Sequence, residues 1–189
     1  TYQGETKWYW YGEDKTDGYR TVDGGVRVYS SEDLYNWKEE GVALRNLTDE
    51  YDFEEEYFKE LYKDYTEEQK AKVLLAINDT TSVLERPKVI YNEKNDNYVM
   101  WFHADGPTET SNSNYAAASA GVAVSDSPTD PFRFIDRYRL NYVDGKHDQS
   151  KGMARDMNLF VDDDKTAYII YSSEENATLF ISKLNEDYT

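Results

Sequence analysis

The sequence predicts an all-β fold made of repeated blades of antiparallel strands, a β-propeller. The first observation is an internal repeat: residues 86–101 (RPKVIYNEKNDNYVMW) align without gaps on residues 156–171 (DMNLFVDDDKTAYIIY), at an offset of 70 throughout. Each copy reads as an apolar strand, a turn rich in Asp, Asn and Lys, and a second strand that ends in an aromatic residue. Short strands alone would also fit a β-sandwich, but a repeat of this period favours the propeller.

A third strand with a common ending is the second observation. Residues 25–30 (GVRVYS), 121–125 (GVAVS) and 178–182 (TLFIS) are each followed by a polar turn and then an aromatic side chain. Such an ending can pass the chain from one blade to the next. Residues 7–11 (KWYWY) match the second strand of the repeat, with its first strand absent. We therefore expect about three blades, of which the first is incomplete.

One segment interrupts this pattern. Residues 50–77 are rich in Glu, Lys, Tyr and Leu and contain neither Gly nor Pro, a composition that favours helix. Thr66-Glu-Glu-Gln69 is a candidate capping box that would open a helix running to Ile77. We expect one or two short helices between the first two blades. The predicted organisation is an incomplete blade (1–44), a helical insertion (45–80), a blade (81–140) and a further blade (150–189).

The composition limits the partners of the chain. The net charge of −17 and the pI near 4.4 exclude nucleic acid and anionic membrane surfaces, which would repel such a protein. No apolar run reaches the length of a membrane span, and the absence of Cys excludes thiolate chemistry. A neutral, hydroxyl-rich ligand remains permitted. The 18 Tyr and 4 Trp can build a core and also line a sugar site.

Three carboxylates are candidates for that site. In a propeller the first strand of each blade lines the central channel, where an unneeded charge is hard to accommodate. Glu85 and Asp156 stand at the start of this strand in two repeats, one register apart, and Glu13 closes the second strand of the first unit. We expect the three to point toward one concavity. A carboxylate in a surface turn is the alternative for each of them.

No metal or cofactor site is predicted. The chain has only two histidines, His103 and His147, and His103 is interpreted as a hydrogen-bonded structural residue. Asp162-Asp-Asp-Lys165 lacks the spaced oxygen ligands and the terminal Glu of a calcium loop, so it is assigned to a hairpin turn.

Several motifs, in their order and spacing, carry a family resemblance. They are WYWYGEDK, GVRVYSSEDLYNWKEEG, ERPKVIYN, YVMWFHAD, GVAVSDSPTDPF, RDMNLFVDDD and AYIIYSSEENATLFISKL. Together they resemble the exo-β-1,3-galactanase branch of glycoside hydrolase family 43, over nearly the whole chain outside the helical insertion. The resemblance implies a five-bladed propeller, and a secreted or periplasmic bacterial protein.

The resemblance also implies roles for individual residues. Asp156 matches the aspartate that tunes the pKa of the general acid, and Glu85 and Glu13 match carboxylates that bind hydroxyls of the terminal galactose. Glu85 and Asp156 are therefore the candidates closest to catalysis. Tyr115 resembles the ring that packs on the same sugar, and Asn176 resembles a further sugar contact.

Two features of the family have no match in this sequence. Members begin earlier, with a His-Gly-Gly-like strand, and continue into a blade with a Glu-Ala-Pro-Ala-like segment that bears the general acid. A later blade supplies the group that handles the water, an amide in this branch. We therefore expect a part of a propeller that is inactive on its own and pairs with the remainder of the same propeller.

The expected function of the whole is that of an inverting exo-β-1,3-galactanase acting on arabinogalactan-type β-1,3-galactan. Two alternatives stay open. The first is a galactoside-binding propeller without catalysis, and the second is a family 43 arabinofuranosidase or xylosidase.

Overall fold

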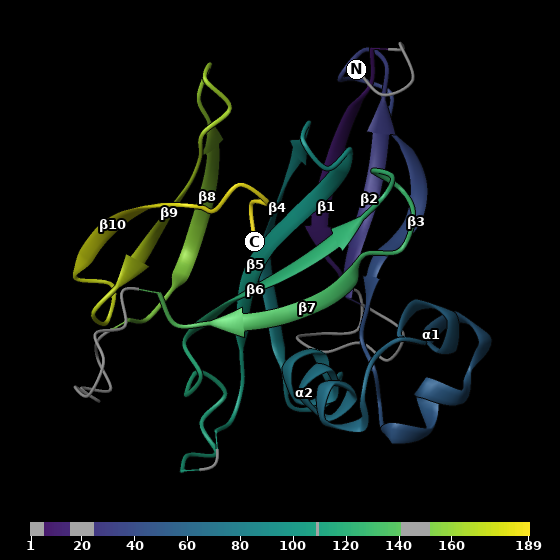
Figure 1. Cartoon of the computed structure of the whole chain (residues 1–189), viewed down its shortest axis with the longest axis vertical. Helices are drawn as coiled ribbons and strands as arrows, with labels where there is room; N and C mark the ends of the chain where they lie inside the picture. The colour runs from purple at the N-terminus through teal and green to yellow at the C-terminus, as the bar shows by residue number, and fades with distance from the viewer. Residues whose placement is uncertain (1–5, 16–24, 109, 141–151) are drawn as a thin grey trace.

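The computed structural model describes residues 6–15, 25–108, 110–140 and 152–189, and within them the strands form three antiparallel sheets (Figure 1). The first sheet contains β1 (Trp8–Glu13), β2 (Gly25–Ser31) and β3 (Lys38–Arg45) in that order. The second contains β4 (Val83–Asn92), β5 (Asn97–Asp105), β6 (Ser119–Ser125) and β7 (Arg133–Tyr138). The third contains β8 (Arg155–Val161), β9 (Ala167–Ser173) and β10 (Thr178–Lys183).

The three sheets stand next to one another, with β4 packed against β1 on one side and β8 on the other. The all-β class and the succession of antiparallel sheets are therefore confirmed. A closed ring of five blades, and the assignment of the first sheet as an incomplete blade, stay predictions. Residues 1–5, 16–24, 141–149 and the start of the predicted third blade at 150–151 lie outside the described residues, as does His147.

Strand β5 lies at the centre of the fold, and its sequence explains why. Successive side chains of a strand point to opposite faces, and four successive residues of β5 are buried on both faces. Val99 and Trp101 belong to the core shared with the third sheet. Met100 and Phe102 belong to the core shared with the first sheet and the helices. A continuous apolar run is what a strand between two packed layers requires.

The predicted helical insertion is present and packs against the outer strand of the second sheet. It comprises η1 (Glu50–Glu54), α1 (Glu56–Leu61) and α2 (Glu67–Ile77). The capping box is confirmed, because Thr66 Oγ1 accepts from the Gln69 amide while the Gln69 side chain accepts from the Thr66 amide.

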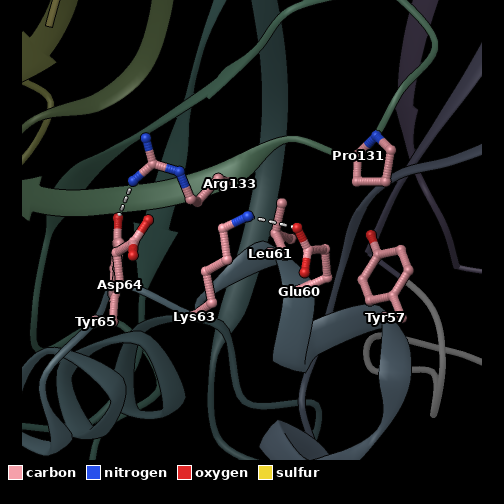
Figure 2. Close-up of a pocket in the computed structure, with 8 residues that line it drawn as sticks. All are labelled: Tyr57, Glu60, Leu61, Lys63, Asp64, Tyr65, Pro131 and Arg133. Atoms are coloured by element: carbon pink, nitrogen blue, oxygen red, sulfur yellow. Dashed lines mark hydrogen bonds and ion pairs between the residues drawn. The ribbon is translucent and has the colours of Figure 1, made fainter.

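Hydroxyl groups of the insertion bind the backbone of β7 along the edge that does not pair with β6. The Tyr65 hydroxyl donates to the Phe134 carbonyl at 2.8 Å, and the Phe134 amide donates to the Tyr62 hydroxyl at 3.2 Å. The Arg133 guanidinium donates to the same Tyr65 oxygen at 2.7 Å (Figure 2). Unpaired backbone groups at a sheet edge invite pairing with another chain, so the insertion protects this edge.

The hairpin turn predicted at Asp162–Lys165 is confirmed, since it joins β8 to β9 and the Asp162 amide donates to the Thr166 carbonyl at 2.9 Å. Among the described parts of the chain, no helix combines the length and the apolar character needed to cross a membrane.

Candidate functional site

An open pocket of about 570 Å³ lies where β4 and β8 meet. This volume falls within the range of about 300–1,000 Å³ that is usual for ligand sites. Four of the five residues predicted for the site line it: Glu85, Tyr115, Asp156 and Asn176. Its other lining residues include Arg86, His103, Arg155 and Glu175. Almost all of these side chains are polar, so the pocket suits a ligand with many hydrogen-bonding groups.

Matching β-bulges shape the floor of the pocket. In β4, Glu85 pairs with His103 and Lys88 with Trp101, so two residues of β4 oppose one of β5. The same irregularity separates Arg155 from Asn158 in β8. Each bulge has one residue in the left-handed region, Arg86 at φ 54° and Asp156 at φ 47°. A bulge leaves one residue unpaired with the neighbouring strand and changes the direction of its side chain.

The two bulge residues contact one another across the sheets. Arg86 and Asp156 occupy equivalent positions of the 70-residue repeat, and Arg86 Nε lies 2.5 Å from Asp156 Oδ1. Both side chains are about half exposed, so the pair faces solvent at the pocket and is available to a ligand.

Glu85 is the more enclosed of the two carboxylates, with 14% of its side chain exposed. The Tyr115 hydroxyl donates to its Oε1 at 3.2 Å, and Lys15 Nζ lies 3.3 Å from the same oxygen. Its Oε2 lies 3.5 Å from His103 Nδ1. The ammonium and the phenol are thus two donors placed on one oxygen of Glu85.

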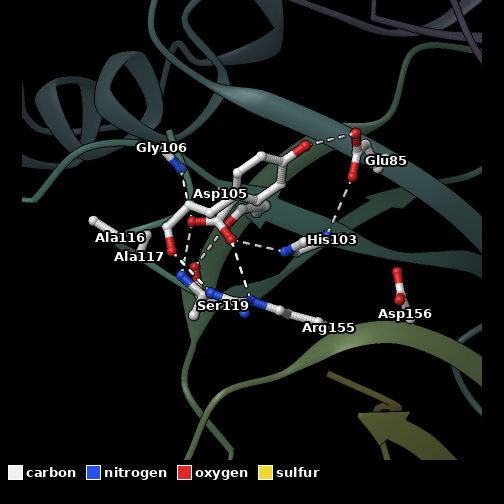
Figure 3. Close-up of polar contacts among 12 residues, drawn as sticks. Glu85, His103, Asp105, Gly106, Ala116, Ala117, Ser119, Arg155 and Asp156 are labelled. Carbon is white, nitrogen blue, oxygen red and sulfur yellow. Dashed lines mark hydrogen bonds and ion pairs between the residues drawn. The ribbon is translucent and has the colours of Figure 1, made fainter. Parts of the chain in front are cut away.

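A buried network stands behind Glu85 (Figure 3). His103 Nε2 lies 2.8 Å from Asp105 Oδ2, and the Asp105 carboxylate is 0% exposed. The backbone amides of Gly106 and Ala118 both donate to Asp105 Oδ1, at 2.9 and 2.8 Å. Burial by itself would raise the pKa of Asp105, but the hydrogen bonds from His103 and the two amides outweigh it and lower the pKa. Asp105 is therefore a buried anion at neutral pH.

Arg155 connects this network to the rim of the pocket. Its Nε lies 3.8 Å from Asp105 Oδ2, and its guanidinium donates to the Tyr115 carbonyl at 2.9 Å. The same group reaches Glu175 at 3.3 Å. Arg155 thus fixes the loop that carries Tyr115, whose ring centroid lies 6.0 Å from that of His103.

Asn176 enters the pocket from the turn between β9 and β10. Glu174, Glu175 and Asn176 all have left-handed backbones, with φ of 51°, 55° and 63°. Non-glycine residues in this region are strained, and such residues concentrate at functional sites. The Asn176 side-chain oxygen accepts from the Ser172 hydroxyl at 2.9 Å, which orients the amide.

The expectation that Glu13 points toward the same concavity as Glu85 and Asp156 stays a prediction. Glu13 lies at the end of β1 and lines a different hollow, together with Trp10, Asp14 and Arg27. Lys15 connects the two places, because its Nζ lies 3.0 Å from Glu13 Oε2 and 3.3 Å from Glu85 Oε1. The Glu13 and Glu85 carboxylates therefore flank one ammonium group.

Sequence reasoning missed Asp105 and Arg155, and it assigned His103 only a structural part. A signal was available for Arg155, because it is the repeat counterpart of Glu85, as Asp156 is the counterpart of Arg86. The period of two along β5 places His103 and Asp105 on one face. Within the ranges that the structure describes, no group of three or more potential ligands is arranged to hold a metal ion.

No protein-family model and no curated protein matches the chain. Solved structures do match. An exo-β-1,3-galactanase of Phanerochaete chrysosporium, crystallised with β-1,3-galactotriose, is 32% identical with a TM-score of 0.69 over 98% of this chain. A family 43 β-1,3-galactosidase with galactodeoxynojirimycin is 34% identical with a TM-score of 0.72 over 100% of it. An exo-β-1,3-galactanase of Clostridium thermocellum is 31% identical with a TM-score of 0.69 over 96% of it.

The chain spans 34%, 56% and 32% of the lengths of these three proteins. Over nearly every residue of this chain, both the sequence and the fold are similar to those of the three proteins. The resemblance inferred from the sequence motifs is confirmed: the chain is a relative of the exo-β-1,3-galactanase branch of glycoside hydrolase family 43.

Proposed function

We propose that this chain forms part of the sugar-binding site of an inverting exo-β-1,3-galactanase, a glycoside hydrolase that removes terminal galactose from β-1,3-galactan. The observation that supports this most is the meeting of Glu85, Tyr115, Asp156 and Asn176 in one open polar pocket. One structural relative, the Phanerochaete chrysosporium enzyme, was crystallised with β-1,3-galactotriose and also with galactose.

The chemistry of the pocket fits a terminal sugar ring. A hydroxyl-rich ring offers donors that a carboxylate accepts strongly, because hydrogen bonds to a charged group are stronger than neutral ones. In this proposal Glu85 accepts from galactose hydroxyls in place of the Tyr115 phenol and Lys15, which contact its Oε1. The half-exposed Tyr115 ring offers an apolar face for the C–H groups of the sugar.

Asp156 takes the part of the residue that tunes the general acid. Inverting hydrolysis needs an acid on the leaving oxygen and a base for the attacking water, on opposite faces of the ring. We assign neither group to this chain. Asp156, held by Arg86 at 2.5 Å, instead adjusts the protonation of an acid supplied by the remainder of the propeller. Glu13, at the neighbouring hollow, binds a galactose hydroxyl if Lys15 moves aside.

Calorimetric titration of the 189-residue chain with galactose tests this proposal. We expect binding in the wild type and at least about tenfold weaker binding in Glu85→Gln, since hydrogen bonds to a charged group contribute about 1.5–3 kcal/mol. Glu60→Gln is the matched control, because Glu60 lies exposed on α1 and contacts only Lys63 among the ion pairs described. Equal affinity in the Glu85 variant and the control would place the sugar elsewhere.

A turnover assay separates the enzyme from the binding protein. Because general acid catalysis contributes about 10²–10⁴ in rate, we expect this chain alone to release negligible galactose from β-1,3-galactan, and a longer chain that includes the remaining blades to release it. Binding without turnover in both would favour a galactoside-binding propeller. Preference for arabinose or xylose over galactose in the titration would favour the other family 43 activities.

A further inference from the structure

His103 lies directly behind Glu85, and one of its two ring nitrogens has no hydrogen bond. The two residues are cross-strand partners in the β4–β5 ladder, so their side chains meet on the same face. The imidazole is 3% exposed, with Nε2 2.8 Å from Asp105 Oδ2. Nδ1 is buried and without a hydrogen bond, and it lies 3.5 Å from Glu85 Oε2.

Asp105 determines which way the imidazole presents its protons. Two backbone amides donate to Asp105 Oδ1, so Oδ2 is the oxygen left for His103. Arg155 Nε lies 3.8 Å from Oδ2, and the hydrogen bonds from His103 and the two amides lower the pKa of Asp105 despite its burial. An anionic acceptor requires that His103 Nε2 carry a hydrogen. The opposite ring nitrogen then faces Glu85.

The proton on that second nitrogen follows from the surroundings of Glu85. A neutral imidazole carries one N–H, so with Nε2 protonated its Nδ1 would direct a lone pair at the Glu85 carboxylate. Lys15 and the Tyr115 hydroxyl both contact Oε1, so the carboxylate form of Glu85 has two donors on that oxygen. Two facing acceptors repel one another and form no hydrogen bond. A stable arrangement therefore needs an imidazolium, with one proton toward each carboxylate.

We propose that His103 is a positioning residue, an imidazolium that holds Glu85 Oε2 from behind and so directs Oε1 at a sugar hydroxyl. This inference rests on the proposed function, in which Glu85 contacts the sugar. The distance of 3.5 Å is long for a hydrogen bond. Contacts of this kind often shorten when the substrate binds. His103 thus gives a buried carboxylate one orientation that it would not have alone.

Two variants of His103 separate positioning from packing. His103→Gln extends a donor to the place of Nε2 and keeps the contact with Asp105, but it loses the group that faces Glu85. His103→Asn keeps a donor near the place of Nδ1 and loses the contact with Asp105. If His103 positions Glu85, we expect galactose affinity to fall about tenfold in His103→Gln, the effect of one lost hydrogen bond to a charged group. In His103→Asn we expect it to fall about threefold or less.

Urea unfolding of the same variants supplies the contrast. A role limited to packing predicts that affinity follows stability, with His103→Gln the better variant because it keeps the buried contact with Asp105. Affinity and stability that rank the two variants in opposite orders support the proposal. Affinities that rank with stability overturn it.

Nitrogen-15 spectroscopy of the His103 ring tests the proton without any sugar. At neutral pH we expect a proton on Nδ1 in the wild type and none in Glu85→Gln, because the variant removes the negative charge that holds it. His147→Gln identifies the signals of His103, since the chain has two histidines. The same Nδ1 protonation in both proteins overturns the proposal. If the wild type binds no galactoside, the proposed function fails, and the Nδ1 signal still decides whether His103 and Glu85 are joined by a proton.

Discussion

Substitutions of Asp105 test the buried network that supports the site. In Asp105→Asn the remaining side-chain oxygen can still accept from the Gly106 and Ala118 amides, since both donate to Oδ1. The variant loses the charged acceptor of His103 at 2.8 Å. We expect the free energy of unfolding at pH 7 to fall by about 1.5–3 kcal/mol, the usual contribution of a hydrogen bond to a charged group.

Asp105→Ala removes the acceptor of the two amides as well. Each buried N–H left without a partner costs about 1–3 kcal/mol, so the total loss is expected to reach about 3–5 kcal/mol, as when a buried ion pair loses one member. Urea unfolding followed by tryptophan fluorescence measures both variants. Asp64→Asn, at an exposed position of the insertion, is the control and should change the free energy by less than about 0.5 kcal/mol.

The pH dependence gives a second check on Asp105. Its pKa is lowered in the folded protein, so its contribution is fully present above the unfolded value of about 3.9 and is lost as the pH falls below it. The difference in stability between wild type and Asp105→Asn should therefore shrink when the pH is lowered from 5 toward about 3. A difference that is small at pH 7, or that stays constant down to pH 3, would refute a buried anion at this position.

Two further substitutions test the fold that carries the site. Gly121→Ala should destabilise the protein by about 1–3 kcal/mol through overpacking, because a Cβ there would lie 2.6 Å from Phe102 Cζ and 2.9 Å from Ala104 Cβ. An unchanged free energy of unfolding in urea would contradict this packing. Thr66→Ala should cost about 1 kcal/mol by removing the cap of α2, whereas Thr66→Ser should restore most of it, with both measured by thermal unfolding.

Features that depend on neighbouring residues were predictable from the sequence. The Thr66–Gln69 capping box is a local hydrogen-bond pattern, and it is present as expected. The turn at Asp162–Lys165 follows from the polar side chains between two apolar strands. The placement of Glu85 near Asp156 followed from the position of both at the start of an inner strand, together with the repeat.

Features that depend on pairing between strands were not predictable in the same way. The two repeats align without a gap, yet Asn92 pairs with Asn97 across a four-residue turn, whereas Val161 pairs with Ala167 across a five-residue turn. A difference of one residue in a hairpin changes the register without changing the hydrophobic pattern of either strand.

The bulges explain how two carboxylates one register apart come to line the same pocket. Without a bulge, neighbouring residues of a strand point to opposite faces, so Glu85 and the residue aligned with Asp156 could not both face the ligand. The left-handed residues Arg86 and Asp156 interrupt that alternation in both strands. Each strand therefore offers two side chains to one concavity, Glu85 and Arg86 from β4, and Arg155 and Asp156 from β8. Arg86 pairs with Asp156, and Arg155 faces Asp105. The two bulges therefore supply both the polar lining of the pocket and the buried contacts behind it.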